Sequence, residues 1–155
     1  MSDLRELYQE VILDHSRQPR NFRRPDKANR EAKGDNPLCG DKVAVFLTIE
    51  DGKVTDVGFQ GRGCAISMAS ASLMTEIVKG KSEAEARALF ESFHDEMTGK
   101  STCHGAAAGE LDKLTVLSGV REYPMRVKCA TLSWHTLMAA LNKAQTVSTE
   151  SDDRL

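Results

Sequence analysis

The sequence predicts a small α+β fold, and three local patterns support this prediction. Residues 41–60 have the alternation of two strands joined by a tight turn. Residues 4–12 carry apolar side chains at helical spacing, and residues 64–98 have the pattern of two further helices. Strands that follow one another directly, with helices elsewhere in the chain, are typical of α+β domains rather than of alternating α/β domains.

The N-terminal helix is predicted from apolar residues spaced three and four apart. These residues are Leu4, Leu7, Tyr8, Val11 and Ile12. Such spacing places the side chains on one face of a helix. Pro19 marks the latest end of this helix, because a helix rarely continues through proline. Residues 20–38 are polar and contain Pro25, Gly34 and Pro37, so we expect an irregular loop there.

The two strands are predicted from alternating hydrophobicity on either side of a turn signal. In residues 41–50 the alternating apolar residues are Val43, Val45, Leu47 and Ile49. Asp51-Gly52 is a two-residue turn of the kind that tolerates positive φ and closes a β-hairpin. The return strand, residues 53–60, carries Val57 and Phe59 on one face. This pattern predicts an antiparallel hairpin.

Four helices are predicted after the hairpin. They cover residues 64–80, 83–98, 110–121 and 130–145. The first of them is rich in Ala and Ser, which indicates close packing against another element. Ser82 and Glu85 have the spacing of a capping box at the start of the second. A glycine- and alanine-rich loop, residues 99–109, is expected before the third.

Length and composition predict one globular domain. The chain has 155 residues, of which 40% are hydrophobic and 28% are charged, and a chain of this size can bury a core. We expect one domain over residues 1–145 and a disordered polar tail over residues 146–155. The net charge of −2 gives no electrostatic argument for a nucleic acid or membrane partner. Without a signal-peptide pattern or a membrane span, we expect a cytoplasmic protein whose cysteines stay reduced.

Three of the cysteines lie at the ends of predicted elements. Cys39 precedes the first strand, Cys64 lies between the second strand and the helix after it, and Cys129 directly precedes the last predicted helix. Asp41 follows Cys39 by two residues, so in an extended chain both side chains point to one side. A helix N-terminus lowers the pKa of a thiol. We therefore expect reactive thiolates at Cys64 and Cys129.

Three thiolates and one carboxylate form a ligand set that suits zinc or iron. Structural zinc sites more usually contain only Cys or Cys with His, so the Asp41 carboxylate indicates a site that opens. The negative charge of these ligands exceeds that of a divalent ion. Three nearby cations are candidates for charge balance or partner docking: Arg62, Arg126 and Lys128. On spacing alone, buried thiols without a metal are an equally good interpretation, since no C-x-x-C pair involves these cysteines.

Taken together, the cysteine segments resemble the NifU/IscU/SufU family of iron–sulfur cluster assembly proteins. The segments are NPLCGD, GRGCAIS and KCATLSWHTL, and the opening LYQEVILDHSRQPRN is similar to the family's N-terminal segment. The resemblance covers residues 4–143 in order. It implies a three-stranded antiparallel sheet packed with helices, whose third strand we expect near residues 61–64. It also implies one metal site at an end of the fold, formed by Cys39, Asp41, Cys64 and Cys129.

Two departures from the IscU-type pattern resemble the SufU branch of the family. IscU-type scaffolds carry His directly before the third cysteine, where this chain has Lys128. The interval from Cys64 to Cys129 is also longer, by an insertion that we place at residues 92–115. SufU-type proteins are similar to zinc-bound sulfur acceptors that work with a SufS-type cysteine desulfurase. The resemblance implies a zinc-dependent sulfurtransferase that receives persulfide sulfur on Cys39 and supplies downstream SUF assembly proteins.

Two other functions fit the same ligands. One is a non-enzymatic scaffold on which a [2Fe–2S] cluster is assembled and transferred, with iron or the cluster in place of Zn²⁺. The other is a structural zinc module that only mediates protein contacts. Lys128 and the insertion favour sulfur transfer. Cys103-His104 lie in the predicted loop, where the family pattern does not reach them, and they fit an additional ligand pair, a resolving thiol or no role.

Overall fold

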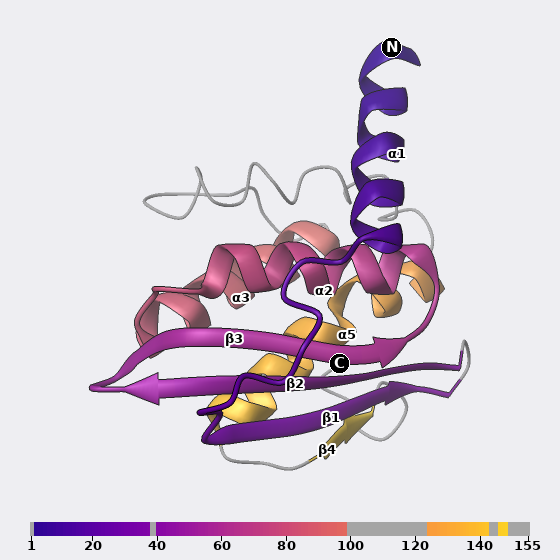
Figure 1. Ribbon diagram of the computed structural model, residues 1–155. Coiled ribbons are helices and arrows are strands. Elements are labelled where there is room, and N and C mark those ends of the chain that lie inside the picture. Colours follow the sequence, from indigo (N-terminus) through magenta and orange to yellow (C-terminus); the bar gives the residue numbers. More distant parts are fainter. Residues whose placement is uncertain (1, 38–39, 99–123, 143–145, 149–155) are drawn as a thin grey trace.

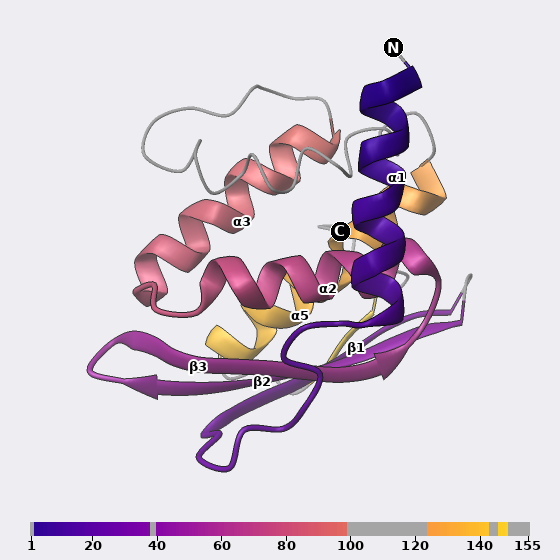
Figure 2. The same cartoon turned by 45° about the horizontal axis from the view of Figure 1, so that its top comes forward.

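The structure is a computed structural model that describes residues 2–37, 40–98, 124–142 and 146–148 (Figure 1). Its elements, in chain order, are α1 (Ser2–Arg17), β1 (Arg30–Asn36), β2 (Asp41–Glu50), β3 (Lys53–Arg62), α2 (Ala65–Val78), α3 (Glu83–Thr98), α5 (Pro124–Leu141) and β4 (Thr146–Ser148). Figure 2 shows α2 and α5 packed over one face of the sheet, with α1 standing against α2. The α+β class is confirmed.

The sheet has the strand order β3-β2-β1-β4. β1, β2 and β3 are antiparallel, which confirms the expected three-stranded sheet. β4 adds a short strand that runs parallel to β1, with Lys33 opposite Thr146 and Asp35 opposite Ser148. We expected a disordered tail from residue 146 onward. This boundary is wrong, because residues 146–148 form β4 and pair with β1. Residues 149–155 lie outside the described part of the chain.

The β2–β3 hairpin is confirmed at its turn and in its burial pattern. Asp51 and Gly52 both have positive φ, 53° and 76°, as a type I′ turn requires. Val43 and Val45 point into the core and are buried. A register shift between Thr48 and Ile49 marks a bulge near the turn.

β1 lies within residues 20–38, where we expected a loop, and not near residues 61–64. Residues 61–62 instead end β3. The inward-facing residues of β1 are Ala32, Gly34 and Asn36, all buried. None of them is β-branched, so the strand lacks the usual apolar signal. Pairing with β2 holds this segment extended.

The helices that follow the hairpin begin close to where they were predicted. α2 is buried over most of its length, consistent with its small Ala and Ser side chains. The capping box of α3 is confirmed: the Ser82 N–H donates to Glu85 Oε1 at 2.9 Å, and the Glu85 N–H donates to Ser82 Oγ at 3.1 Å. The predicted loop 99–109 and helix 110–121 lie outside the described residues.

The last helix begins earlier than predicted. α5 starts at Pro124 rather than near residue 130 and ends at Leu141. Proline is well suited to the first turn of a helix, because the N–H that it lacks would have no partner within the helix there. Cys129 is consequently inside α5 and not at its N-terminus. This correction changes the electrostatic environment expected for that thiol.

The core lies between the sheet and its covering helices. Its largest fully buried side chains include Trp134 of α5, Phe59 of β3 and Phe93 of α3. The rings of Phe93 and Trp134 lie 5.1 Å apart between centroids. His15 near the end of α1 is also buried, and its Nδ1 lies 2.7 Å from the Ser72 hydroxyl of α2. Among the described residues, every helix is too short or too polar to cross a membrane.

Candidate metal centre

Three of the four predicted ligands converge at the end of the sheet where β2 begins and β3 ends. They are Asp41 at the start of β2, Cys64 directly before α2, and Cys129 within α5. One ligand atom from each of them lies within 4.8 Å of the others. The fourth predicted ligand, Cys39, lies outside the described residues. Residues far apart in sequence thus form one group because the start of β2 and the N-terminus of α2 meet the second turn of α5.

Asp41 is tied to Cys64 through the backbone as well as through space. The Cys64 N–H donates to Asp41 Oδ1 at 3.0 Å. The other carboxylate oxygen, Oδ2, lies 3.9 Å from Cys64 Sγ. Asp41 is only 1% exposed, and a buried carboxylate needs such partners to offset its lost hydration. The hydrogen bond fixes one carboxylate oxygen and leaves the other facing the sulfur.

The two glycines before Cys64 give this arrangement its space. A Cβ on Gly63 would lie 2.6 Å from Asp41 Oδ1, and a Cβ on Gly61 would lie 2.2 Å from the Lys42 carbonyl oxygen. Either distance is far below van der Waals contact. The close approach of β3 to β2 and to the carboxylate therefore requires glycine at both positions. The sequence signal for this space is the G-x-G pattern directly before Cys64.

Cys64 has the reactive environment that its position predicted. It is the N-cap of α2, and its Sγ accepts a hydrogen bond from the Ser67 N–H at 3.4 Å. A hydrogen bond from the Cys129 thiol, assisted by the Ser67 N–H, lowers the pKa of Cys64 to about 6. Hydrogen bonds to the thiolate favour the charged form. The expected direction of the shift is confirmed for Cys64, but its largest cause is the Cys129 thiol and not the N-terminus of α2.

Cys129 differs from this expectation. Its pKa is raised, because its thiol donates to Cys64 and because its surroundings are buried. Inside α5 it also lacks the free N–H groups of a helix N-terminus, so the predicted low pKa was wrong. Asn36 Nδ2 donates to Cys129 Sγ at 3.8 Å from the end of β1. Asn36 is a buried neighbour of the site that the sequence reasoning missed, although it opens the NPLCGD segment.

The donor atoms fit a thiophilic transition metal. Ligands at zinc–sulfur distances of about 2.3 Å in a tetrahedron lie about 3.8 Å from one another. The three ligand atoms lie within 4.8 Å of one another, so they would need to move by only about 1 Å to reach this geometry. Two sulfurs and one carboxylate oxygen suit Zn²⁺ or iron better than Mg²⁺ or Ca²⁺, which prefer oxygen ligands alone.

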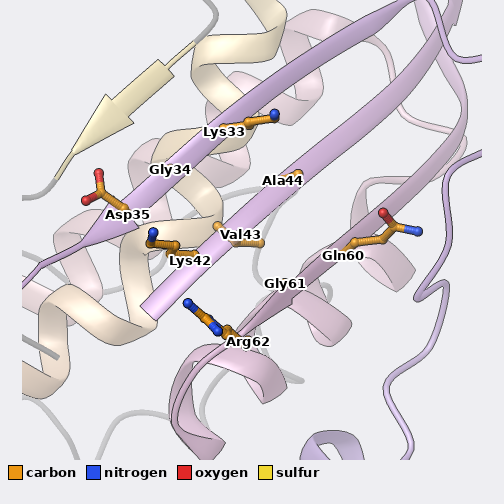
Figure 3. Close-up of a pocket in the computed structure, with 9 residues that line it drawn as sticks. All are labelled: Lys33, Gly34, Asp35, Lys42, Val43, Ala44, Gln60, Gly61 and Arg62. Atoms are coloured by element: carbon orange, nitrogen blue, oxygen red, sulfur yellow. The ribbon is translucent and has the colours of Figure 1, made fainter. Parts of the chain in front are cut away.

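The three predicted cations occupy different environments. Arg62 lies opposite Lys42 in the β2–β3 register, and both are exposed on the face of the sheet away from the helices (Figure 3). Arg126 is exposed near the start of α5, and Lys128 is half-buried beside Cys129. Charge balance or partner docking by these residues stays a prediction, and the position of Arg62 favours docking. Cys103-His104 lie outside the described residues.

The fold and this donor set define a small α+β protein with a thiolate–carboxylate cluster at one end of its sheet. The family described as NifU-like N terminal domain matches residues 7–145. The chain belongs to this family, which confirms the resemblance carried by the cysteine segments.

Two curated relatives align with nearly the whole chain. The zinc-dependent sulfurtransferase SufU of Bacillus subtilis (strain 168) is 38% identical over 146 residues, covering 93% of this chain and 95% of the relative. The iron–sulfur cluster assembly scaffold protein IscU of Streptococcus pyogenes serotype M1 is 37% identical over 144 residues, covering 93% and 88%.

A solved structure has the same fold. It is that of a candidate iron–sulfur cluster assembly scaffold protein for the SUF system, FiSufU, from Fervidobacterium islandicum AW-1. It is similar with a TM-score of 0.76 and 35% identity, covering 85% of this chain and 94% of that one.

Proposed function

We propose that this protein works in iron–sulfur cluster assembly as a zinc-dependent sulfur acceptor. It takes persulfide sulfur from a SufS-type cysteine desulfurase through Cys39 and supplies it to downstream SUF assembly proteins. The observation that carries the proposal is the convergence of Asp41, Cys64 and Cys129 within 4.8 Å. The chain's similarity to a SufU-type sulfurtransferase supports it.

The ligand set is suited to exchange. Bound zinc would keep the thiol ligands deprotonated at neutral pH and hold them together. Asp41, Cys64 and Cys129 would hold it, with Cys39 as the fourth ligand. The Asp41 oxygen is the hardest of these donors and the one that a soft metal releases most readily. IscU-type scaffolds carry His at the position of Lys128. In this chain a cation, and not an imidazole, therefore directly precedes Cys129.

The sulfur transfer is a thiol exchange that balances without an added oxidant. The Cys39 thiolate attacks the outer, sulfane sulfur of the desulfurase persulfide. A new sulfur–sulfur bond forms on Cys39 while the bond to the desulfurase cysteine breaks. That cysteine leaves as a thiolate, and Cys39 carries the persulfide.

A second function keeps the same residues but changes the cargo. In this alternative the protein is a scaffold, and a [2Fe–2S] cluster is built on Cys39, Cys64, Cys129 and Asp41 and then transferred. Similarity to an IscU scaffold supports it. Both functions use the same ligand residues. Identifying the bound metal or cluster therefore distinguishes between the two functions. A structural zinc module would use the ligands without any transfer.

Metal analysis and sulfur transfer together test the proposal. Protein purified without oxygen is expected to be colourless, to hold one zinc per chain, and to increase desulfurase turnover. Cys39→Ala is expected to abolish the increase, while Cys103→Ala is the matched control and should retain it. A stable brown cluster at physiological iron levels would support the scaffold instead. Full stimulation by Cys39→Ala would show that the site is only structural.

A further inference from the structure

The outer face of the sheet is divided into a covered half and an open half. Near the β2–β3 turn, Phe46 and Thr48 point to this face and are buried. The segment between α1 and β1 covers them, and the Arg24 guanidinium lies 5.1 Å from the centre of the Phe46 ring. Toward the metal centre, no described element covers the face. There Lys33, Lys42, Gln60 and Arg62 are exposed (Figure 3).

The open half is a shallow depression with cations along its sides. It has a volume of about 540 Å³. Two rows of residues, paired across β1, β2 and β3, line it: Lys33, Ala44 and Gln60, then Asp35, Lys42 and Arg62. Glycines of β1 and β3 and the small Ala44 side chain form the floor, so a partner's chain can approach closely. Three cations face one carboxylate, in a chain whose net charge is −2.

These three cations differ from two neighbouring arginines, whose charges are neutralised by salt bridges. Arg23 is paired with Asp56 at 3.0 Å, and Arg24 with Glu31 at 3.0 Å. Among the described residues, no carboxylate oxygen comes within 4.0 Å of the charged nitrogens of Lys33, Lys42 or Arg62. Their charge is therefore available to a partner.

The depression adjoins the metal centre. Lys42 directly follows the ligand Asp41, and Arg62 precedes the ligand Cys64 by two residues. A molecule bound to these cations would lie on the opposite face of the sheet from the predicted ligands. It would lie next to the end of the sheet where β2 begins and β3 ends. The proposed function requires another protein at that end, because sulfur or a cluster passes between proteins there.

We propose that the open half of the outer sheet face docks an acidic segment of the protein that exchanges sulfur with the metal centre. The inference rests on the proposed function for the choice of that partner. Opposite charges steer two proteins into contact and fix their register. The overall charge of −2 would repel an acidic partner elsewhere, so a local basic surface selects the orientation of approach. The same overall charge argues against a nucleic acid occupant.

A paired charge reversal separates this surface from the ligands. Lys33→Glu/Lys42→Glu reverses two cations of the depression and leaves Asp41, Cys64 and Cys129 unchanged. Lys27→Glu/Lys53→Glu makes the same change in charge at two exposed lysines away from the depression. Circular dichroism and zinc content establish that both variants fold and keep their metal.

Association of each zinc-loaded protein with a SufS-type cysteine desulfurase is then measured by biolayer interferometry at about 50 mM and about 300 mM NaCl, where screening differs strongly. The depression variant is expected to associate roughly tenfold more slowly than the wild type at low salt and to lose most of its salt dependence. The control variant is expected to stay within about twofold of the wild type. Equal rates for the two variants would overturn the proposal.

Two further probes keep this result apart from the proposed function. If the wild type neither binds nor stimulates the desulfurase, the sulfur-acceptor function fails. A fluorescent peptide of about eight glutamates, whose charge resembles an acidic segment, then tests the surface alone. Binding that Lys33→Glu/Lys42→Glu abolishes supports acidic docking, and unchanged or absent binding overturns it. Tighter binding of a single-stranded DNA of about 20 bases than of the peptide would also overturn it, in favour of a nucleic acid.

Discussion

The Asp41 carboxylate anchors the backbone of Cys64, with 3.0 Å between its Oδ1 and the Cys64 nitrogen. This hydrogen bond joins the first residue of β2 to the N-cap of α2. It therefore sets the distance between two predicted metal ligands before any metal binds. The second carboxylate oxygen is left 3.9 Å from Cys64 Sγ, where it can serve as a ligand.

We predict that Asp41→Asn keeps the fold but weakens zinc binding by at least about tenfold. The amide oxygen can still accept the Cys64 N–H, whereas it brings no negative charge to the metal. Competition with a chromophoric chelator measures the affinity. Asp35→Asn, which removes a carboxylate on the outer face of the sheet, is the matched control and should bind zinc like the wild type. Equal affinity of the Asp41 and Asp35 variants would contradict Asp41 as a ligand.

We predict that Gly63→Ala lowers both stability and metal affinity. Its Cβ would lie 2.6 Å from Asp41 Oδ1, so the carboxylate must move, at a cost of about 1–3 kcal/mol. Gly58→Ala is the control, because its Cβ would lie 2.2 Å from the Arg23 carbonyl oxygen, away from the ligands. Urea unfolding should show a loss in both variants. Zinc competition should show a loss only in Gly63→Ala, and normal zinc affinity there would refute the assigned role.

We predict that the metal-free protein is alkylated at Cys64 with a midpoint near pH 6. The pKa of Cys64 is lowered to about 6 by the Cys129 thiol and the Ser67 N–H, so the reactive thiolate increases as the pH rises through that value. Cys129, with its raised pKa and buried position, should resist alkylation over the same range. Brief iodoacetamide treatment followed by peptide mass spectrometry measures each cysteine separately.

The Cys129→Ala variant supplies the control for that titration. Without the thiol that donates to Cys64, the Cys64 midpoint should move upward, toward the ordinary value of about 8.5. An unchanged midpoint in this variant would show that Cys129 is not the cause of the low pKa.

We predict that Ser82→Ala lowers the unfolding free energy by about 1 kcal/mol, because α3 loses its N-cap. The hydrogen bonds with Ser82 also lower the pKa of Glu85. The folded-state pKa then lies below the unfolded one, so this stabilisation is complete at neutral pH and is lost as the pH falls through the folded value. Chemical denaturation at neutral and acidic pH measures both effects. Ser92→Ala within α3 should be neutral or slightly stabilising, and an equal loss there would contradict the capping role.

The elements that sequence reasoning located correctly are those whose signals are local. The β2–β3 hairpin follows from alternation around Asp51-Gly52, and the start of α3 follows from Ser82 and Glu85. Both depend on residues within a few positions of each other. Cys64 could also be placed, because a strand end and a helix start directly flank it. The direction of its pKa shift agrees with that position, although the largest cause is the Cys129 thiol, which is distant in sequence.

The elements that sequence reasoning missed depend on distant neighbours. β1 has small inward-facing residues such as Ala32 and Gly34 because α5 packs closely against it, and its extended form comes from pairing with β2. Pro124 reads as a break, whereas in the fold it opens α5. For that reason, the prediction that Cys129 lies at a helix N-terminus was wrong. The contact between Asn36 and Cys129 spans 93 positions in sequence, so no local sequence pattern predicts it.

The alternation of Asp41 and Lys42 along β2 has an evolutionary consequence. Successive residues of a strand point to opposite faces, so the predicted ligand Asp41 faces the helices while Lys42 faces outward. If the outer face docks the partner as proposed, substitutions there can change the choice of partner while the geometry of the cysteines is preserved. Members of one family could then acquire new protein partners and keep the same metal ligands, because partner choice and metal binding would depend on opposite faces of the same strand.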